Sequence, residues 1–206
     1  MPLKIIRGDI VRMEVDAIVN PANQTLLGGG GVDGAIHDAA GYELYLECRK
    51  LGGCETGDAK ITKAYGHLRC KHVIHTVGPV WHGGHDSEPE ELASCYRRSL
   101  EVAVENGCET VAFPLISSGG YNYPKELALD IAVKSILDFL AEHEREHRLD
   151  ITLALYDEET LQLAKRLFGE LTRWEVKGYG NSDSKRGNRS KRFTLYPDPA
   201  SWGRNT

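Results

Sequence analysis

The chain of 206 residues is predicted to fold as a three-layer α/β domain, in which a central β-sheet is covered by helices on both faces. Two observations predict this fold. Short β-branched apolar runs alternate with longer segments of helical periodicity, which is the pattern of α/β architecture. The helical periodicity then stops at Arg173. We therefore expect one domain over residues 1–172 and a basic C-terminal tail over residues 173–206.

The strands are predicted from apolar runs that are bounded by Gly, Pro and Asp. They cover Leu3–Ile6, Asp16–Val19, Ala59–Ala64, His72–Val77, Thr110–Ile116 and Ile151–Tyr156. The fifth run is almost continuously apolar, as expected of a strand that is buried in the centre of a sheet.

Four helices are predicted from apolar residues that recur every three or four positions. The first begins near Asp33 and continues toward Cys48, the second spans about Pro89–Glu105, the third has Pro124 as its first residue, and the fourth begins at about Glu158. Ligands of α/β sheets bind outside the carboxyl ends of the strands. The loops that lead into the first and third helices are therefore expected to form two walls of one cleft.

The first of these loops belongs to the most unusual stretch of the chain, Asn20–His37, with the sequence NPANQTLLGGGGVDGAIH. Its four consecutive glycines, Gly28–Gly31, allow positive φ angles and leave main-chain N–H groups open to a ligand. A helix that begins near Asp33 adds unpaired N–H groups and the positive end of its dipole. Together they predict a phosphate site. The alternative is a flexible glycine-rich loop without chemistry.

Two familiar phosphate-binding motifs do not fit this stretch. Gly29, Gly31 and Gly34 match the dinucleotide fingerprint, but that motif needs its first glycine directly after a strand. Here the eight residues from Asn20 to Leu27 separate the strand from the glycines. No Gly-Lys-Ser/Thr sequence follows, which excludes a P-loop.

Charge is distributed unevenly along the chain. The net charge is −5, but the tail from Arg173 holds 8 basic and 3 acidic residues, so the rest, with 17 basic and 27 acidic residues, carries −10. An acidic body argues against a general nucleic-acid binder and implies that backbone amides would hold a polyanionic ligand. Aromatic residues interleave with the basic ones in the tail, which is therefore either a binding arm or a solvated extension.

The cysteines and histidines predict neither disulfides nor a metal site. The five cysteines form no CxxC pair, which favours reduced thiols and a cytoplasmic protein. A cluster of His67, Cys70, His72 and His75 fits no standard structural zinc spacing. No run approaches a membrane span, and residues 1–20 lack the apolar core of a signal peptide. We expect a monomer without metal or cofactor and without a membrane partner.

The stretch NPAN-x4-GGGGVDGAIH resembles the signature of macrodomains, in particular of the MacroD-type branch. Three further segments match at corresponding places, namely Gly8-Asp9-Ile10, HTVGPVW from His75 to Trp81, and ISSGGYNYP from Ile116 to Pro124. The segment Leu153–Leu171 resembles the last strand and helix of that family. The resemblance covers about Pro2–Leu171 and implies a macrodomain with a mixed central sheet.

The resemblance implies that the ligand is ADP-ribose. Asp9 would bind the adenine amino group with Ile10 beside it, and the adenine would stack on Tyr156. Without the resemblance, Asp9 is a turn-forming residue and Tyr156 a core tyrosine. The amides of Asn20 and Asn23 suit ribose hydroxyls, although either could simply cap the turn. The resemblance implies that Asn23 contacts the distal ribose, whereas Asn20 is expected to be more structural.

Asp33 has two interpretations. It is either the N-cap of the first helix, which needs no function, or a general base that activates a water at the distal ribose. In MacroD-type enzymes the matching Asp has the second role, at an ester bond on that ribose. The resemblance then implies that Asn23 assists Asp33 in catalysis and that Gly31 and Val32 supply nearby amides.

The second loop is expected to bind the diphosphate and to cover the distal ribose. Amides and hydroxyls for the diphosphate would come from Ser117, Ser118, Gly119 and Gly120, and the cover from Tyr121. The family's usual glycine-aliphatic-aromatic-glycine appears here as Gly119-Gly120-Tyr121-Asn122. Asn tolerates a left-handed backbone, so the turn is expected to survive. Gly120 removes an aliphatic wall, which bears on affinity and turnover.

The function implied by the resemblance is that of a hydrolase. It would remove mono-ADP-ribose from acidic side chains of proteins and deacetylate O-acetyl-ADP-ribose, so its partners would be ADP-ribose and ADP-ribosylated proteins. Two alternatives stay open at this point. One is a reader module that binds ADP-ribose without turnover, and the other is a phosphatase that acts on ADP-ribose 1″-phosphate.

Overall fold

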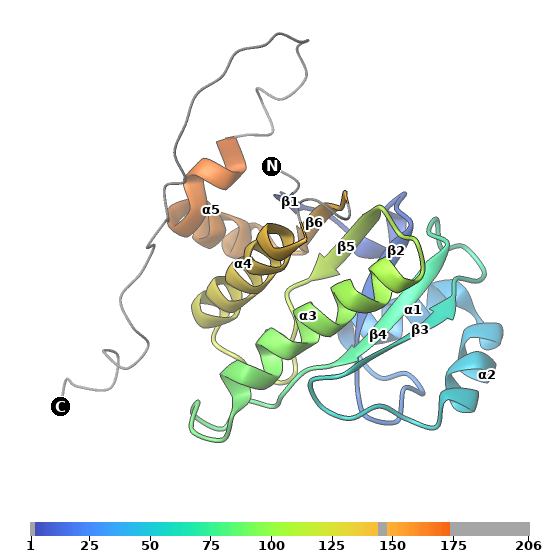
Figure 1. The fold of residues 1–206 in the computed structure, drawn as a ribbon. Coiled ribbons are helices and arrows are strands. Elements are labelled where there is room, and N and C mark those ends of the chain that lie inside the picture. The colour runs from blue at the N-terminus through green and yellow to red at the C-terminus, as the bar shows by residue number, and fades with distance from the viewer. Residues whose placement is uncertain (1–2, 144–147, 174–206) are drawn as a thin grey trace, which may run out of the picture.

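The computed structural model describes residues 3–143 and 148–173. A sheet with the strand order β1-β6-β5-β2-β4-β3 lies between two layers of helices (Figure 1). Its strands are β1 (Leu3–Arg7), β2 (Ala17–Ala22), β3 (Ala59–Lys63), β4 (His72–Val77), β5 (Thr110–Pro114) and β6 (Asp150–Leu155). All neighbours are parallel except β3 and β4, which are antiparallel. The prediction of an α/β fold with a mixed sheet is confirmed.

The helices differ from the prediction at three ends. They are α1 (Gly31–Ala40), α2 (Tyr42–Leu51), α3 (Glu88–Glu105), α4 (Lys125–Glu142) and α5 (Glu158–Arg173), with a 3-10 turn η1 (Ile10–Arg12) after β1. The single first helix expected from Asp33 to Cys48 is wrong, because Gly41 at φ 83° breaks it into α1 and α2. Helix α1 begins two residues before Asp33, and Pro124 is the N-cap of α4 and not its first residue.

Each face of the sheet has its own core. Helices α3, α4 and α5 pack on one face, where residues such as Leu92 and Leu129 are buried. Helices α1 and α2 cover the other face through residues such as Ile36. Successive side chains of a strand point to opposite faces, so Ile18 joins the α1 side and Val19 the α3 side. The alternation accounts for the three layers.

Strand β2 is longer than the sequence indicates. It continues through Asn20 and Pro21 to Ala22, because β4 pairs with it over its whole length. Its other neighbour, β5, pairs with it only at Ala17 and Ile18. The two strands therefore separate toward their carboxyl ends, and this separation places the candidate site.

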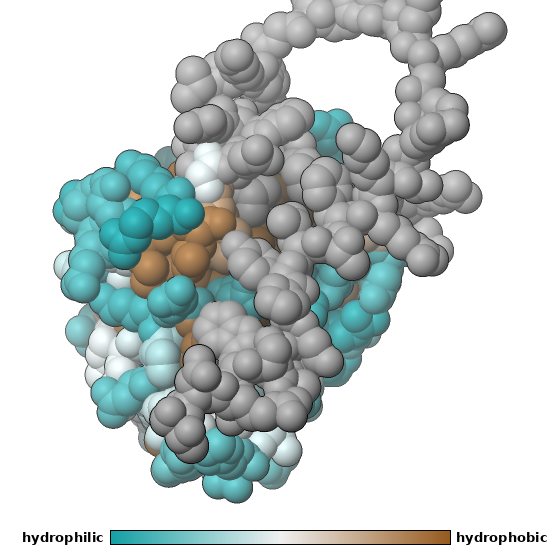
Figure 2. Space-filling view, turned by 90° about the vertical axis from the view of Figure 1, so that its left-hand side faces the viewer, coloured by the Kyte–Doolittle hydropathy of each residue, from teal (hydrophilic) through white to brown (hydrophobic). Residues whose placement is uncertain are grey.

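The described surface is largely hydrophilic on the face shown in Figure 2, with an apolar area among the polar residues. Over residues 3–143 and 148–173, no helix combines the length and apolar character needed to cross a membrane. The predicted tail lies outside the described residues apart from Arg173, which ends α5.

Candidate functional site

The predicted ligand residues follow four parallel strands that end at one edge of the sheet. Asp9 and Ile10 follow β1, Tyr156 follows β6, and the loop of residues 117–123 follows β5. The glycine loop and α1 follow β2. The strand order β1-β6-β5-β2 therefore arranges these residues in one row along the edge.

A cleft lies beside β2 at this edge. Its volume is about 490 Å³, and its lining includes Asn23 and Thr25 from the glycine loop, Gly78 after β4, and Tyr121 from the loop after β5. Tyr121 and the residues Asn23 and Thr25 therefore line one cleft, and its other walls include the acidic residues Asp86, Glu88 and Glu91. The glycines Gly28–Gly31 and the residues Ser117–Gly120 are not part of this lining, so a cleft enclosed by both loops stays a prediction.

The glycine loop is shaped by residues that have no side chain. Gly28 and Gly31 have positive φ angles of 90° and 61°. A Cβ atom at Gly34 would lie 2.6 Å from the carbonyl oxygen of Gly29, so this approach needs glycine. Gly30 is the N-cap of α1, and no side chain caps the helix. The first amides of α1 and the positive end of its dipole therefore face the loop without a competing side chain.

Asp33 is buried inside the first turn of α1, so the interpretation as an N-cap is wrong. Its exposed fraction is 4%. The amide Nδ2 of Asn20 donates to its Oδ1 at 2.7 Å. Burial raises the pKa of the Asp33 carboxyl group, although the hydrogen bond from Asn20 and the charge of His37 act in the opposite direction. A raised pKa suits a general base better than that of an ordinary aspartate.

Asn23 is held within the glycine loop. Its Nδ2 donates to the Gly28 carbonyl at 3.0 Å, and its Oδ1 accepts from the backbone N and the hydroxyl of Thr25 at 3.1 and 2.6 Å. A Cβ atom at Gly29 would lie 3.0 Å from Asp33 Oδ2 and 3.3 Å from Asn23 Nδ2. Gly29 therefore lies over both predicted catalytic residues, and Asp33 Oδ2 faces the loop.

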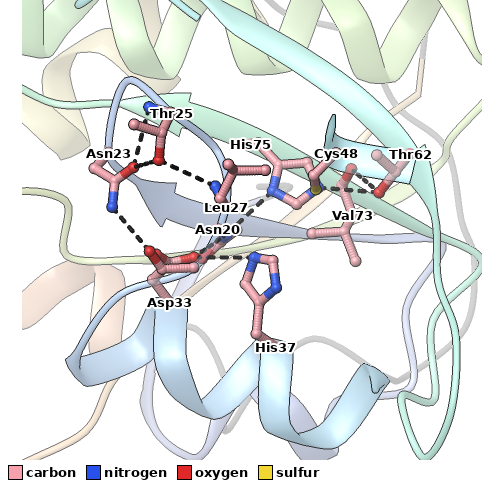
Figure 3. Close-up of polar contacts among 11 residues, drawn as sticks. Asn20, Asn23, Thr25, Leu27, Asp33, His37, Cys48, Thr62, Val73 and His75 are labelled. Carbon is pink, nitrogen blue, oxygen red and sulfur yellow. Dashed lines mark hydrogen bonds and ion pairs between the residues drawn. The ribbon is translucent and has the colours of Figure 1, made fainter. Parts of the chain in front are cut away.

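The structure joins Asn20 and Asp33 to polar residues that the sequence interpretation did not place at the site (Figure 3). Nδ2 of Asn20 also lies 3.0 Å from Nδ1 of His75, and Nε2 of His75 lies 3.0 Å from the Thr62 hydroxyl and 3.6 Å from Cys48 Sγ. His37 Nε2 lies 3.5 Å from Asp33 Oδ1. We call these six residues the polar cluster, namely Asn20, Asp33, His37, Cys48, Thr62 and His75.

Two signals in the sequence indicate this cluster. Asp33 and His37 are four residues apart, so they lie on one face of a helix. Asn20 stands between Ile18 and Ala22 in the alternation of β2, and both neighbours point into the α1 side of the core. A polar residue at an apolar position of a buried strand needs partners. The network supplies them for Asn20 Nδ2, whereas Asn20 Oδ1 has no hydrogen-bond partner among the described residues.

The sequence spacing of His67, Cys70, His72 and His75 predicts no metal site. In the structure, His75 lies close to His37 and Cys48 instead. Among the described residues, His37, Cys48 and His75 bring ligand atoms within 4.8 Å of one another. Both ring nitrogens of His75 already contact neighbours, and burial raises the pKa of the Cys48 thiol to about 12. Within this trio, His75 is thus already engaged with Asn20 and Thr62, whereas His37 Nε2 has no hydrogen-bond partner among the described residues.

The second loop keeps the expected turn. Asn122 has a φ angle of 57°, so asparagine does adopt the left-handed backbone there, and its N–H donates to the Gly119 carbonyl at 2.9 Å. The carbonyl of Tyr121 accepts from Trp81 N at 2.9 Å. A Cβ atom at Gly78 would come within 2.2 Å of Ser117 Oγ. The HTVGPVW segment thus supports this loop from the side of β4.

The second loop is most exposed at Gly119 and Gly120, which follow the half-buried Ser118. Around a Cβ built on Gly119 or Gly120 there is no atom within 4 Å, so nothing in the described residues requires glycine there. The Ser118 hydroxyl donates to the Leu115 carbonyl at 2.8 Å, whereas the buried Ser117 hydroxyl has no hydrogen-bond partner among the described residues. Ser117 Oγ is therefore a buried hydroxyl without a partner, close to Gly78, which lines the cleft.

The opposite end of the row is more exposed. Asp9 caps η1, because its Oδ1 accepts from Val11 N at 3.1 Å, which agrees with the interpretation of Asp9 as a turn-forming residue. Ile10 beside it is buried. Tyr156 is 80% exposed, so the interpretation as a core tyrosine is wrong. Strands β1 and β6 are neighbours, with Arg7 opposite Leu155. Asp9 and Tyr156 consequently follow adjacent strand ends.

Comparison with known proteins agrees with this architecture. The family model described as Macro domain matches residues 19–132. A macro domain-containing protein of Mesorhizobium japonicum is 54% identical over 169 residues, which cover 82% of this chain and 94% of the relative. An O-acetyl-ADP-ribose deacetylase of Cronobacter turicensis is 49% identical over 172 residues, which cover 82% of this chain and 96% of the relative.

A solved structure is similar as well. The crystal structure of the Trypanosoma brucei macrodomain in complex with ADP-ribose has a TM-score of 0.74 and 40% sequence identity, and the match covers 81% of this chain and 68% of that one. The residues 19–132 matched by the family model contain the glycine loop and the polar cluster, and the two relatives of about 50% identity each match 82% of this chain. The chain belongs to the macro domain family.

Proposed function

We propose that this chain binds ADP-ribose along the carboxyl edge of its sheet and hydrolyses an ester bond at the distal ribose. The observation that carries the proposal is the order of residues along that edge. Asp9 and Tyr156 suit adenine, the loop after β5 and the first amides of α1 suit the diphosphate, and Asn23 suits a ribose. Adjacent strands are about 4.8 Å apart, so β1 and β2 are separated by about 14 Å, a span suited to an extended dinucleotide.

The diphosphate would be held without basic side chains. The amides of Ser117, Ser118, Gly119 and Gly120 and the hydroxyl of Ser117 would form one wall. The N-terminus of α1, with the amides of Gly31 and Val32, would form the other. Tyr121 lines the same cleft as Asn23 and would cover the distal ribose. This arrangement is consistent with the acidic body of the domain.

Asp33 would perform the chemistry. Its Oδ2 faces the glycine loop, where it would accept a proton from a water that attacks the acyl carbon of the ester. The bond between the acyl carbon and the ribose oxygen would break, and the ribose oxygen would take up a proton. The products would be ADP-ribose and a carboxylic acid. We infer two substrates of this class, O-acetyl-ADP-ribose and proteins that carry mono-ADP-ribose on acidic side chains.

The similarity to a relative named O-acetyl-ADP-ribose deacetylase and to a macrodomain solved with ADP-ribose supports this proposal. Isothermal titration calorimetry with ADP-ribose and AMP, together with a turnover assay on O-acetyl-ADP-ribose, tests it. ADP-ribose should bind at least about tenfold more tightly than AMP, because the second phosphate and the distal ribose add contacts. Equal affinities would contradict the assigned ligand. Binding of ADP-ribose without turnover would indicate a reader module.

A further inference from the structure

A row of polar contacts crosses the α1 side of the core and ends at Asp33. It runs from the Thr62 hydroxyl to His75 Nε2 over 3.0 Å, from His75 Nδ1 to Asn20 Nδ2 over 3.0 Å, and from Asn20 Nδ2 to Asp33 Oδ1 over 2.7 Å. Asn20 and His75 are register partners on β2 and β4, and both are 0% exposed. Such a network inside an apolar core calls for a reason beyond packing.

The charge of Asp33 determines the direction of every hydrogen bond in the row. An ionised carboxylate only accepts, so the amide nitrogen of Asn20 must face it and donate. The second hydrogen of that amide then points to His75 Nδ1, which must accept. The proton of the neutral ring consequently lies on Nε2, from which it is donated to the Thr62 hydroxyl. Thr62 donates in turn to the Val73 carbonyl at 3.5 Å.

The ring of His75 is suited to this role because it stays neutral. Burial, and to a lesser degree the charge of His37, lowers the pKa of His75 to about 3. The ring is enclosed by β2, β3, α1 and α2, from which Asn20, Thr62, His37 and Cys48 face it. A neutral ring with one acceptor and one donor matches the two partners that these strands provide.

We propose that His75 is a positioning residue for Asp33, acting through Asn20. By accepting one amide hydrogen, His75 keeps Asn20 from rotating its amide oxygen toward the carboxylate. The other hydrogen then stays on Asp33 Oδ1, and Oδ2 is left toward the glycine loop for the attacking water. The inference rests on the proposed function, since it explains how the proposed base is oriented.

Variants at position 75 test this role. His75→Leu removes the acceptor and should lower kcat for O-acetyl-ADP-ribose by roughly 10- to 100-fold, the effect of a reacting group misplaced by about 1 Å. KM and the ADP-ribose Kd should change by less than about threefold, since no ligand contact is lost. His75→Asn places an acceptor oxygen near the position of Nδ1 and should recover most of kcat. His72→Leu, on the same strand but the opposite face, is the matched control.

Nitrogen-15 NMR of the histidine rings gives a test that is independent of activity and of the variants' folding. We expect His75 in the wild-type protein to be protonated at Nε2 only. A ring protonated at Nδ1, or turnover that His75→Leu leaves intact in a folded protein, would overturn the role of His75 alone. If the wild type binds ADP-ribose but has no turnover, both the proposed hydrolase activity and the effect of His75 on catalysis are wrong. The tautomer of His75 still tests the direction of the hydrogen bonds in that case.

Discussion

The two ends of the candidate site differ in how they hold their polar groups. At the β1–β6 end, Tyr156 is 80% exposed and Asp9 only caps a short turn. At the β2–β4 end, Asp33 is 4% exposed and Asn20 is fully buried with its donors directed at neighbours. An exposed ring can gain contact area when a ligand stacks on it, whereas a buried carboxylate is oriented in advance. We infer that the first end mainly contributes affinity and the second mainly contributes chemistry.

The largest expected effect tests the buried end. Asp33→Asn should lower kcat for an ADP-ribose ester by roughly 10²- to 10⁴-fold, the usual contribution of a positioned general base. Its affinity for ADP-ribose should change far less, because the amides of both loops remain. Asp38→Asn, on the exposed side of the same helix, is the control. Single-turnover kinetics and calorimetry measure both quantities, and unchanged turnover would remove Asp33 from the mechanism.

The next effect tests the exposed end. Tyr156→Ala should weaken ADP-ribose binding by roughly 5- to 150-fold, which corresponds to about 1–3 kcal/mol for stacking of a base on an aromatic ring. The value of kcat at saturating substrate should remain close to wild type, because Tyr156 lies at the far end of the row from Asp33. Tyr42→Ala, which also removes an exposed tyrosine, is the control. Titration calorimetry measures this affinity, and an unchanged Kd for ADP-ribose in Tyr156→Ala would contradict the assignment of affinity to the β1–β6 end.

The pH dependence of turnover sharpens the comparison further. Because burial raises the pKa of Asp33, the acid limb of the kcat profile should have its midpoint above the ordinary value of 3.8. Below that midpoint, kcat should fall about tenfold per pH unit as the base becomes protonated. A stopped assay between pH 4 and about 8 measures the limb, and a midpoint at or below 3.8 would contradict the assigned burial effect.

The same pKa has a consequence for stability with a defined sign. A carboxyl group whose pKa is raised by folding binds protons more tightly in the folded state. Its contribution to stability is therefore present below the unfolded pKa and is lost as pH rises through the folded pKa. Asp33→Asn removes this loss. In thermal melts, the Tm of the variant minus the Tm of the wild type should therefore increase with pH.

The smallest expected effect concerns the tail. We propose that the domain ends near Thr172, since α5 ends at Arg173 and contributes Leu161 and Ala164 to the core of the sheet face that α3 covers. A chain that stops at Thr172 should bind ADP-ribose as the full chain does, with a change in Tm below about 2 °C. Loss of folding or of binding in calorimetry would show that residues 173–206 belong to the domain.

Much of the fold could be predicted from sequence because periodicity is a local property. The β-branched runs located all six strands within a few residues, and Gly, Pro and the helical rhythm located α3, α4 and α5. The helix break was missed at Gly41, where a single glycine at φ 83° ends α1 although the apolar rhythm continues into α2. A local pattern cannot distinguish a tolerated glycine from one that ends a helix.

By itself the sequence determined which chemical groups this protein offers. It specified a run of glycines that exposes amides, a carboxylate four residues before a histidine, and polar residues after strand ends. Only the tertiary structure decided how they are used. Asn20 contacts His75, which is 55 residues away in the sequence, because β2 and β4 pair in parallel, and it contacts Asp33, which is 13 residues away, because α1 packs on β2. The physical reason is that the alternation along a strand fixes the face of the sheet on which each side chain lies. Which residue it contacts on that face depends on the order of the strands in the sheet.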